Sequence, residues 1–189
     1  MIDPAGDASD AALVGRARAG DQAAYRVLLH RHRDAVFRLA RGHTGGDAGE
    51  ALDIVQESFV AAFAALHRYD PQRPFRVWLL RIALNKARDW SRRRTVRRFF
   101  TRAQPLDAIA DPADSAPTPE AAAHSSRELA RIERAIAALP APLRQVLLLR
   151  AVDGMSQALT AETLSISEKA VETRLYRARR ALSALLEMA

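Results

Sequence analysis

The sequence contains no cysteine. Disulfides, thiolate metal sites and cysteine nucleophiles are therefore excluded, and the chain is compatible with a reducing cytosol. No apolar run approaches the ~20 residues that a membrane-spanning helix needs. The N-terminal residues also lack the basic start and the apolar core of a signal peptide. We therefore expect a cytoplasmic protein that does not insert into a membrane.

Lysine is scarce, because Lys86 and Lys169 are the two lysines among 29 basic residues. The net charge of +7 is consequently carried by arginine, whose planar guanidinium suits bidentate contacts to phosphate and guanine. A GC-rich genome also favours arginine over lysine, so basicity alone is weak evidence. The positions of the arginines must decide which partners they bind.

Strand signals are missing as well. Alternating β-branched runs and Asn-Gly turns do not occur, and apolar residues recur at helical spacing instead. Residues 99–124 are rich in Pro, Ala, Asp and Ser and are predicted to be a flexible linker. They separate two helical units, residues 10–98 and 125–187. We expect an all-α fold of two small helical domains joined by this linker.

Capping residues set the expected helices of the first unit. Asp21 and Asp47 are suitable N-caps, and Gly42 with residues 44–46 is expected to end the helix between them. Two prolines then break the chain before a last helix, predicted from Phe75 to Arg94. This last helix contains most of the informative basic residues.

The second unit has the layout of a helix-turn-helix. Ser125 and Glu128 form a candidate capping box at its start. Ser156 and Ser167 are both good N-caps, and a short helix and a tight turn lie between them. We therefore predict a helix-turn-helix that begins in residues 154–171.

The last helix of the second unit has two faces. Val171, Leu175, Ala178 and Leu182 form an inward stripe. Its polar face consists of Lys169, Glu172, Thr173, Tyr176, Arg177 and Arg180. Recognition helices place such residues against base edges and phosphates. A solvated, salt-bridged surface is the alternative interpretation, and the paired caps favour DNA binding over it.

The helix from Phe75 to Arg94 has a basic line interleaved with an aromatic and an amide. The line consists of Trp78, Arg81, Asn85, Arg88 and Arg92. Arginines can follow a phosphate backbone while aromatic and amide groups hold unstacked bases, as on single-stranded nucleic acid. The alternative is that Trp78 belongs to the core and that the arginines merely cover the helix surface.

Three stretches together resemble the extracytoplasmic-function (ECF) class of sigma factors. Residues 53–59 are similar to the family's polymerase-docking helix, residues 73–85 to its promoter-melting helix, and residues 139–182 to its reader of the upstream element. Without this resemblance, the polar residues of 53–59 would be interpreted as the solvated side of an amphipathic helix. The order and spacing of the three stretches are more specific than any one of them.

The resemblance implies an alternative sigma factor that binds core RNA polymerase and directs promoter-specific initiation. The first unit would dock on the clamp helices of the large polymerase subunit and open the minus-ten element. The second unit would bind the duplex minus-thirty-five element, near the polymerase flap. Polymerase-docking positions are Asp53, Gln56, Glu57 and Phe59. Minus-ten positions are Trp78, Arg81, Asn85, Lys86, Arg88 and Arg92. Minus-thirty-five positions are Ser167, Lys169, Glu172, Thr173, Tyr176, Arg177 and Arg179. The expected partners are core polymerase, promoter DNA and an anti-sigma factor.

The turn of the helix-turn-helix departs from the family pattern. Ser165 stands where the family usually has glycine, and a left-handed backbone there costs a non-glycine residue roughly 1 kcal/mol. Leu159 and Thr160 replace the usual acidic and apolar pair. We expect the packing of the first short helix to differ accordingly.

Two other functions remain as alternatives. A free-standing helix-turn-helix regulator would explain residues 125–187 but would leave the first unit without a role. An enzyme is disfavoured because no Gly-rich phosphate loop, HExxH or GxSxG motif occurs. His30 and His32 do not share a helix face, so no metal site is expected. We predict no catalytic residue, no metal and no cofactor.

Overall fold

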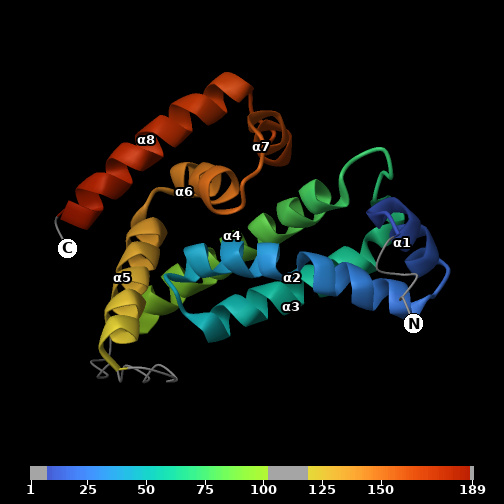
Figure 1. The fold of residues 1–189 in the computed structure, drawn as a ribbon, viewed down its shortest axis with the longest axis horizontal. Coiled ribbons are helices and arrows are strands. Elements are labelled where there is room, and N and C mark those ends of the chain that lie inside the picture. The colour runs from blue at the N-terminus through green and yellow to red at the C-terminus, as the bar shows by residue number, and fades with distance from the viewer. Residues whose placement is uncertain (1–7, 102–118, 188–189) are drawn as a thin grey trace.

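The computed structural model describes residues 8–101 and 119–187, and these residues are helical, without strands (Figure 1). The first unit contains α1 (Asp10–Arg18), α2 (Gln22–Thr44), α3 (Ala48–Ala64), the 3-10 turn η1 (Leu66–Arg68) and α4 (Phe75–Thr101). The second unit contains α5 (Pro119–Ala138), α6 (Ala141–Leu147), the π-helical turn η2 (Leu148–Val152), α7 (Gln157–Leu164) and α8 (Glu168–Glu187). The predicted all-α class is confirmed, and residues 102–118 of the expected linker lie outside the described residues.

Four predicted helix starts are confirmed. The side chains of Asp21, Asp47, Ser156 and Ser167 each accept a hydrogen bond from a main-chain N–H group two or three residues later. These bonds satisfy N–H groups that have no partner within the first turn of a helix. The polar residues therefore fix where the chain enters each helix.

Some predicted boundaries are wrong. The helix end predicted within residues 44–46 is confirmed, because the left-handed Gly45 terminates α2, whereas Gly42 does not end the helix but lies inside it. α4 extends past its predicted end at Arg94 and continues to Thr101. α5 begins at Pro119, before its predicted start. Proline is suited to the first position of a helix, because the N–H group that it lacks would have no partner within the helix there. Ser125 and Glu128 therefore lie within α5 and form no capping box. Local signals cannot exclude such extensions, because alanine-rich and arginine-rich sequence favours helix continuation.

The core of the first unit lies among α2, α3 and α4. Its largest fully buried side chains include Leu28, Phe75, Leu79, Leu80 and Leu84. Full burial of one such side chain contributes about 1.5–3 kcal/mol. Leu29 of α2 and Leu52 of α3 are less buried, with exposed fractions of 39% and 43%.

Asp10 holds α1 against α2. Its carboxylate accepts a hydrogen bond of 2.5 Å from Arg31 and lies 2.8 Å from Nε2 of His32. Burial opposes the charge on Asp10, but the hydrogen bonds and charges of His32 and Arg31 lower its pKa overall. His32 is thereby used within the fold. Among the residues described, no cluster of histidine and carboxylate side chains could hold a metal ion.

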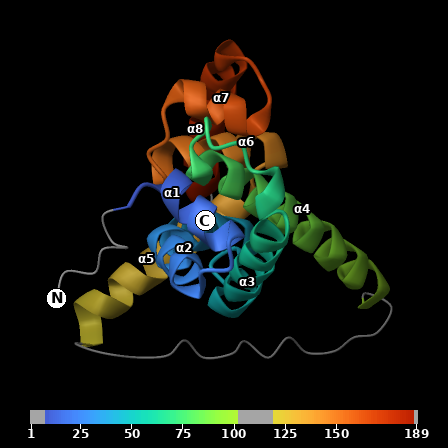
Figure 2. The same cartoon turned by 90° about the vertical axis from the view of Figure 1, so that its right-hand side faces the viewer.

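The two units pack against each other, which the sequence did not predict. Figures 1 and 2 show α6, α7 and α8 together on one side of the first unit. Leu149 and Met155 of the second unit are buried in the core of the first. Leu148 lies over α2, and a Cβ atom at Gly42 would be 2.3 Å from its Cδ2 atom. Glycine at position 42 therefore permits this close approach.

No helix in the described residues is long and apolar enough to span a membrane.

Candidate nucleic-acid interface

Trp78 lies at the edge of the first core. Its half-buried ring lies 5.5 Å from the ring of Tyr69 and 5.6 Å from that of Phe75, measured between centroids. Tyr69 is fixed in turn by a 2.6 Å hydrogen bond from its hydroxyl to the carbonyl oxygen of Arg73. The aromatic cluster therefore supports both the start of α4 and the loop before it.

Arg81 is bound to the helix-turn-helix of the same chain. Its Nη2 atom donates to the carbonyl oxygen of Glu162 at 2.9 Å and to the hydroxyl of Ser165. Its Nε atom donates to the carbonyl oxygen of Thr163 at 3.2 Å. The guanidinium thus donates to carbonyl groups at the C-terminal end of α7, where the helix itself offers few N–H donors.

Arg88 makes a second contact of this kind. Its Nη2 atom donates to the amide oxygen of Gln145 at 2.8 Å, and Gln145 is 4% exposed. Two of the six predicted minus-ten residues are therefore in contact with the second unit. Their positions on one helix face, about two turns apart, match the line expected from the sequence.

The remaining minus-ten positions lie at the surface of α4. Asn85 and Arg92 are exposed, and the amide oxygen of Asn85 accepts a long hydrogen bond of 3.4 Å from Arg88. Lys86 is half-buried, with its Nζ atom 3.8 Å from a carboxylate oxygen of Glu57 on α3. These side chains remain accessible while the two units are packed.

The docking residues predicted on α3 are three polar residues and Phe59. Asp53 and Gln56 are exposed, and Glu57 forms ion pairs with Lys86 and Arg93 of α4. A groove of about 600 Å³ between α3 and the C-terminal part of α4 begins beside them. Phe59 is 3% exposed and belongs to the core. Its assignment as a contact residue is therefore wrong for this conformation, because the side chain supports α3 from inside.

Ser165, in the turn of the helix-turn-helix, has a left-handed backbone conformation. This residue has φ 54° and ψ 50°, and no other described non-glycine residue has positive φ. The N–H groups of Ser165 and Ile166 donate to the carbonyl oxygens of Glu162 and Ala161. These two bonds close the C-terminal end of α7 and turn the chain into α8.

Thr160, one of the two residues of α7 that depart from the family pattern, is accommodated inside the fold. The side chain is fully buried, and its hydroxyl donates to the carbonyl oxygen of Ser156 at 2.9 Å. A buried hydroxyl with a hydrogen-bond partner avoids the cost of an unsatisfied polar group. Ala161 of the same helix forms a small core with Val146 and Val171.

The outer face of α8 is accessible. Tyr176 is 62% exposed, and Lys169 and Glu172 form an ion pair of 2.8 Å between largely exposed side chains. The hydroxyl of Thr173 donates to the carbonyl oxygen of Lys169. The predicted minus-thirty-five residues with exposed side chains are Ser167, Lys169, Glu172, Tyr176, Arg177 and Arg179. These side chains are exposed around α8, and Arg177 and Arg179, two residues apart, lie on different sides of the helix.

Ion pairs between the two units are a feature of the structure that the sequence did not reveal. Asp153, in the loop after η2, pairs with Arg38 of α2 at 3.2 Å and with Arg76 of α4 at 2.5 Å. Arg41 of α2 pairs with Glu133 of α5 at 2.5 Å. The partners are separated by many residues in sequence and lie on different helices. No local pattern could have matched them.

Comparison with known proteins identifies the family. The sigma-70 region 2 profile matches residues 28–97, and the sigma-70 region 4 profile matches residues 129–182. The sequence is 42% identical over 182 residues to RNA polymerase sigma factor CnrH of Cupriavidus metallidurans, covering 95% of each chain. It is 30% identical over 178 residues to the ECF RNA polymerase sigma-E factor of Escherichia coli K12, covering 92% of each chain. The chain belongs to the ECF sigma factors.

Solved structures share the fold of this sigma factor. The structure of CnrH in complex with the cytosolic domain of CnrY has a TM-score of 0.72 and 39% identity, covering 96% of this chain and 99% of that one. The sigma factor RpoE of Bartonella quintana, in complex with the anti-sigma factor NepR, has a TM-score of 0.65 at 19% identity, covering 86% of this chain and 96% of that one, and shows the likeness of fold alone. The ECF sigma factor described here directs promoter-specific initiation as a non-catalytic subunit of RNA polymerase.

Proposed function

We propose that this ECF sigma factor divides promoter recognition between its two units. α8 would read the duplex minus-thirty-five element, and the exposed polar face of its N-terminal half is the observation that carries this assignment. Lys169, Glu172 and Arg177 lie where a recognition helix meets base edges, while Arg179 lies where it meets phosphates. The inward residues Val171 and Ala178 anchor the helix from behind.

The first unit would open and hold the minus-ten element through α4. Asn85, Arg92 and the surrounding guanidinium groups offer hydrogen bonds and positive charge to unstacked bases and to the backbone. Arg81 and Arg88 would join them once their bonds to the second unit are released. Use of the complete minus-ten surface therefore requires the two units to separate.

Core polymerase would bind the polar face of α3, through Asp53, Gln56 and Glu57. Exposure of the first two residues supports this assignment. In Gln56→Ala/Glu57→Ala, competition for core enzyme should weaken about tenfold or more if two interfacial hydrogen bonds are lost. Asp34→Asn, an exposed change on α2, is the matched control. Equal competition by both variants would contradict the docking assignment.

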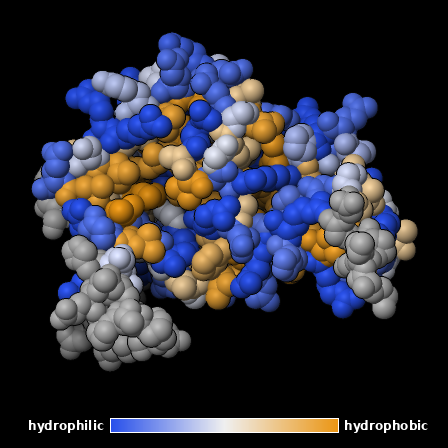
Figure 3. Space-filling model, viewed as in Figure 1, coloured by the Kyte–Doolittle hydropathy of each residue, from blue (hydrophilic) through white to orange (hydrophobic). Residues whose placement is uncertain are grey.

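An anti-sigma factor would cover an apolar strip on the second unit. Figure 3 shows apolar side chains gathered between α8 and α5, and they include Ile132, Leu143 and Leu182, with Leu129 nearby and 50% exposed. The similar chain CnrH was solved with the cytosolic domain of CnrY. We expect Leu129→Ala to weaken binding of a CnrY cytosolic domain used as probe, and Val60→Ala on α3 to leave it unchanged.

Run-off transcription with purified core enzyme tests the whole proposal. The sigma factor should confer start-site selectivity on genomic fragments, and Asn85→Ala should impair promoter opening more than initial binding. Permanganate reactivity of the melted bases measures opening directly, with Thr95→Ala on the same helix as control. Unchanged reactivity in Asn85→Ala would contradict the minus-ten assignment. A free-standing regulator would bind its DNA equally well without polymerase.

A further inference from the structure

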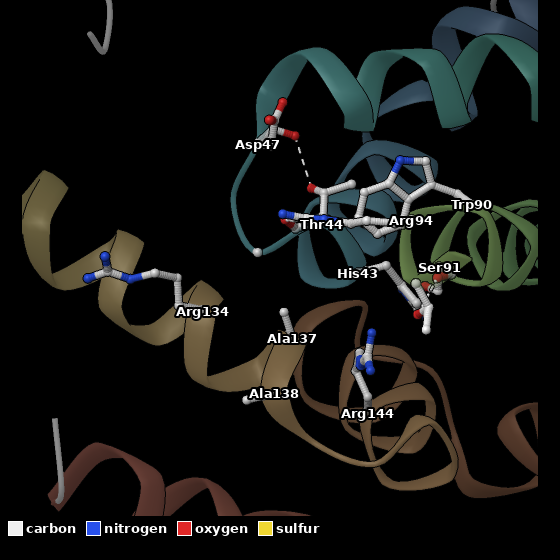
Figure 4. Close-up of a pocket in the computed structure, with 12 residues that line it drawn as sticks. His43, Thr44, Asp47, Trp90, Ser91, Arg94, Arg134, Ala137, Ala138 and Arg144 are labelled. Atoms are coloured by element: carbon white, nitrogen blue, oxygen red, sulfur yellow. Dashed lines mark hydrogen bonds between the residues drawn. The ribbon is translucent and has the colours of Figure 1, made fainter. Parts of the chain in front are cut away.

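A cavity of about 510 Å³ lies at the junction of the two units (Figure 4). The C-terminal end of α2 and one side of α4 form its wall in the first unit. α5 and the start of α6 form its wall in the second. The lining residues used below are His43, Trp90, Arg94, Arg134 and Arg144. The cavity exists because the units are packed together.

His43 contributes a buried nitrogen atom without a partner. The residue is 3% exposed, and its Nδ1 atom lies 2.9 Å from the carbonyl oxygen of Leu39. Because a carbonyl oxygen can only accept, Nδ1 carries the hydrogen and Nε2 carries the lone pair. Nε2 is buried and has no hydrogen-bond partner in the described part of the chain. Burial, together with the charges of Arg144 and Arg88, lowers the pKa of His43 to about 4.

Arg144 contributes a guanidinium without a counter-ion. Its Nη2 atom donates to the carbonyl oxygen of Leu139 at 2.9 Å, whereas its Nε atom is buried and has no partner. No carboxylate of the described residues forms an ion pair with it, and burial lowers its pKa. A half-buried charge without a counter-ion costs free energy that a bound anion would offset. Figure 4 shows Arg144 and His43 directed toward the same space.

Other charged groups near the cavity leave room for an anion. Arg94 lies over the ring of Trp90 and pairs with Glu50 at 3.5 Å. Arg134 stands at the rim with its guanidinium directed away from the interior in Figure 4. The carboxylate of Asp47 is directed to the start of α3, where it accepts the N–H of Glu50. Positive charge therefore dominates the wall.

We propose that this cavity binds a small phosphate-bearing anion, no larger than a nucleotide. The volume lies in the usual range for sites that bind small molecules. Phosphate oxygens would accept hydrogen bonds from Arg144 and Arg94. The neutral Nε2 atom of His43 would accept the hydrogen of a P–OH group or take up that proton itself. The site thus offers a hydrogen-bond donor, Arg144, beside an acceptor, Nε2 of His43. A singly protonated phosphate can bond to both, because it has oxygens that accept and one P–OH group that donates.

Such a ligand would stabilise the packed arrangement of the two units. Residues from both units form the cavity, so separation of the units removes the site. A ligand that binds one of two conformations shifts the equilibrium toward that conformation. Because Arg81 and Arg88 are bound to the second unit in the packed form, the anion would disfavour promoter engagement.

Titration calorimetry with the full-length protein tests the proposal, with inorganic pyrophosphate, sulfate and ATP as probes. We expect saturable binding of pyrophosphate that weakens at least about tenfold in Arg144→Gln, which loses charge-assisted hydrogen bonds. His43→Gln should weaken it as well. Arg26→Gln removes the same charge from an exposed position at the far end of α2 and should bind as the unaltered protein does. Equal weakening in Arg26→Gln would mean non-specific attraction and would overturn the site.

Sulfate separates the role of His43 from the proton of the ligand. Sulfate carries no proton between about pH 5 and pH 8, so it can accept a hydrogen bond from Nε2 of His43 only when the ring has taken up a proton. The charged groups around the ring are Arg88 and Arg94 on α4, Arg144 on α6, Arg134 on α5 and Asp47 before α3. Sulfate affinity should therefore rise as the pH falls, and His43→Gln should remove the rise.

Nuclear magnetic resonance keeps the proposal testable even where a variant folds poorly. The imidazole nitrogen signals of His43 in the unaltered protein should shift on addition of pyrophosphate, while His30 and His67, both exposed, should not. A single-stranded oligonucleotide in place of pyrophosphate distinguishes a backbone phosphate from a small anion. No shift at millimolar pyrophosphate, or a larger shift with the oligonucleotide, would refute the small-anion site. These measurements involve no polymerase, so their failure leaves the promoter-recognition proposal untouched.

Discussion

Arg81 of α4 donates to the carbonyl oxygen of Thr163 at the end of α7, at 3.2 Å. A residue at a predicted minus-ten position therefore completes the helix-turn-helix of its own chain. The same guanidinium reaches Ser165, the one described non-glycine residue with a left-handed backbone. The surfaces proposed to bind DNA in the two units are thus coupled through one side chain.

Ser165→Gly should be nearly neutral in the unaltered protein. Glycine relieves the left-handed strain, about 1 kcal/mol, but removes the hydroxyl that binds Arg81, worth about 0.5–1.5 kcal/mol. In an Arg81→Ala background the hydroxyl has no such role. Ser165→Gly should then raise the free energy of unfolding by about 1 kcal/mol. Urea unfolding of the four proteins measures this cycle, and strict additivity would refute the coupling.

Gly42→Ala should loosen the packing of the units while favouring α2 itself. The added Cβ atom would lie 2.3 Å from Cδ2 of Leu148, whose side chain is buried. Overpacking costs about 1–3 kcal/mol, whereas alanine favours a helix interior by about 1 kcal/mol. The separation between fluorophores on α3 and α8 should increase. Adding Leu148→Ala should reverse the increase, and Gly49→Ala, at the exposed start of α3, should leave the separation unchanged.

Asp153→Asn should release the second unit more directly. The carboxyl side chain is 3% exposed and pairs with Arg38 and Arg76, whose side chains are 46% and 41% exposed. Since the arginines are partly solvated, the expected loss of packing free energy is about 1–2 kcal/mol, less than for a fully buried pair. Binding of free protein to single-stranded minus-ten DNA should increase up to about tenfold, because Arg81 becomes available.

Asp34→Asn is the control for this change, since it removes a carboxylate from an exposed position on α2. Fluorescence anisotropy with a labelled oligonucleotide measures the affinity. An equal increase in both variants would show that net charge, and not the release of the second unit, is responsible.

Interactions between residues close in sequence could be predicted from the sequence, whereas interactions between distant residues could not. Asp21 and Asp47 cap helices through residues two or three positions away, so their roles could be predicted locally. Asp153 acts through Arg38 and Arg76, and nothing in the neighbouring sequence indicates those partners. Gly42 was predicted to be a helix end because glycine often ends helices. Its actual role, the close approach of Leu148, could not be predicted because Leu148 is far away in the chain. Packing between the units therefore accounts for most of what the sequence did not predict.

His43 should make the protein less stable in mild acid. Its pKa in the fold is about 4, from a usual value of 6.5, so below the usual value the unfolded chain binds a proton that the fold does not. Stability from this group is complete above about pH 7 and is lost as the pH falls, by about 3 kcal/mol at pH 4. Unfolding by urea from pH 7 to pH 4.5 should show a shallower loss in His43→Gln. The same slope in both proteins would contradict neutral burial of the ring.

Arg177 tests whether α8 reads sequence or only binds DNA. The side chain is exposed on the outer face of the helix, beside Tyr176. If Arg177 contacts a guanine edge, Arg177→Ala should weaken binding to the cognate upstream element by about 1–3 kcal/mol and reduce discrimination at one base pair. A phosphate contact would instead weaken binding to all sequences alike and lower the salt dependence. Affinities for single-base variants of the element, at two salt concentrations, decide between the two. Arg127→Gln, an exposed change on α5, should leave both properties unchanged, because α5 lies outside the helix-turn-helix.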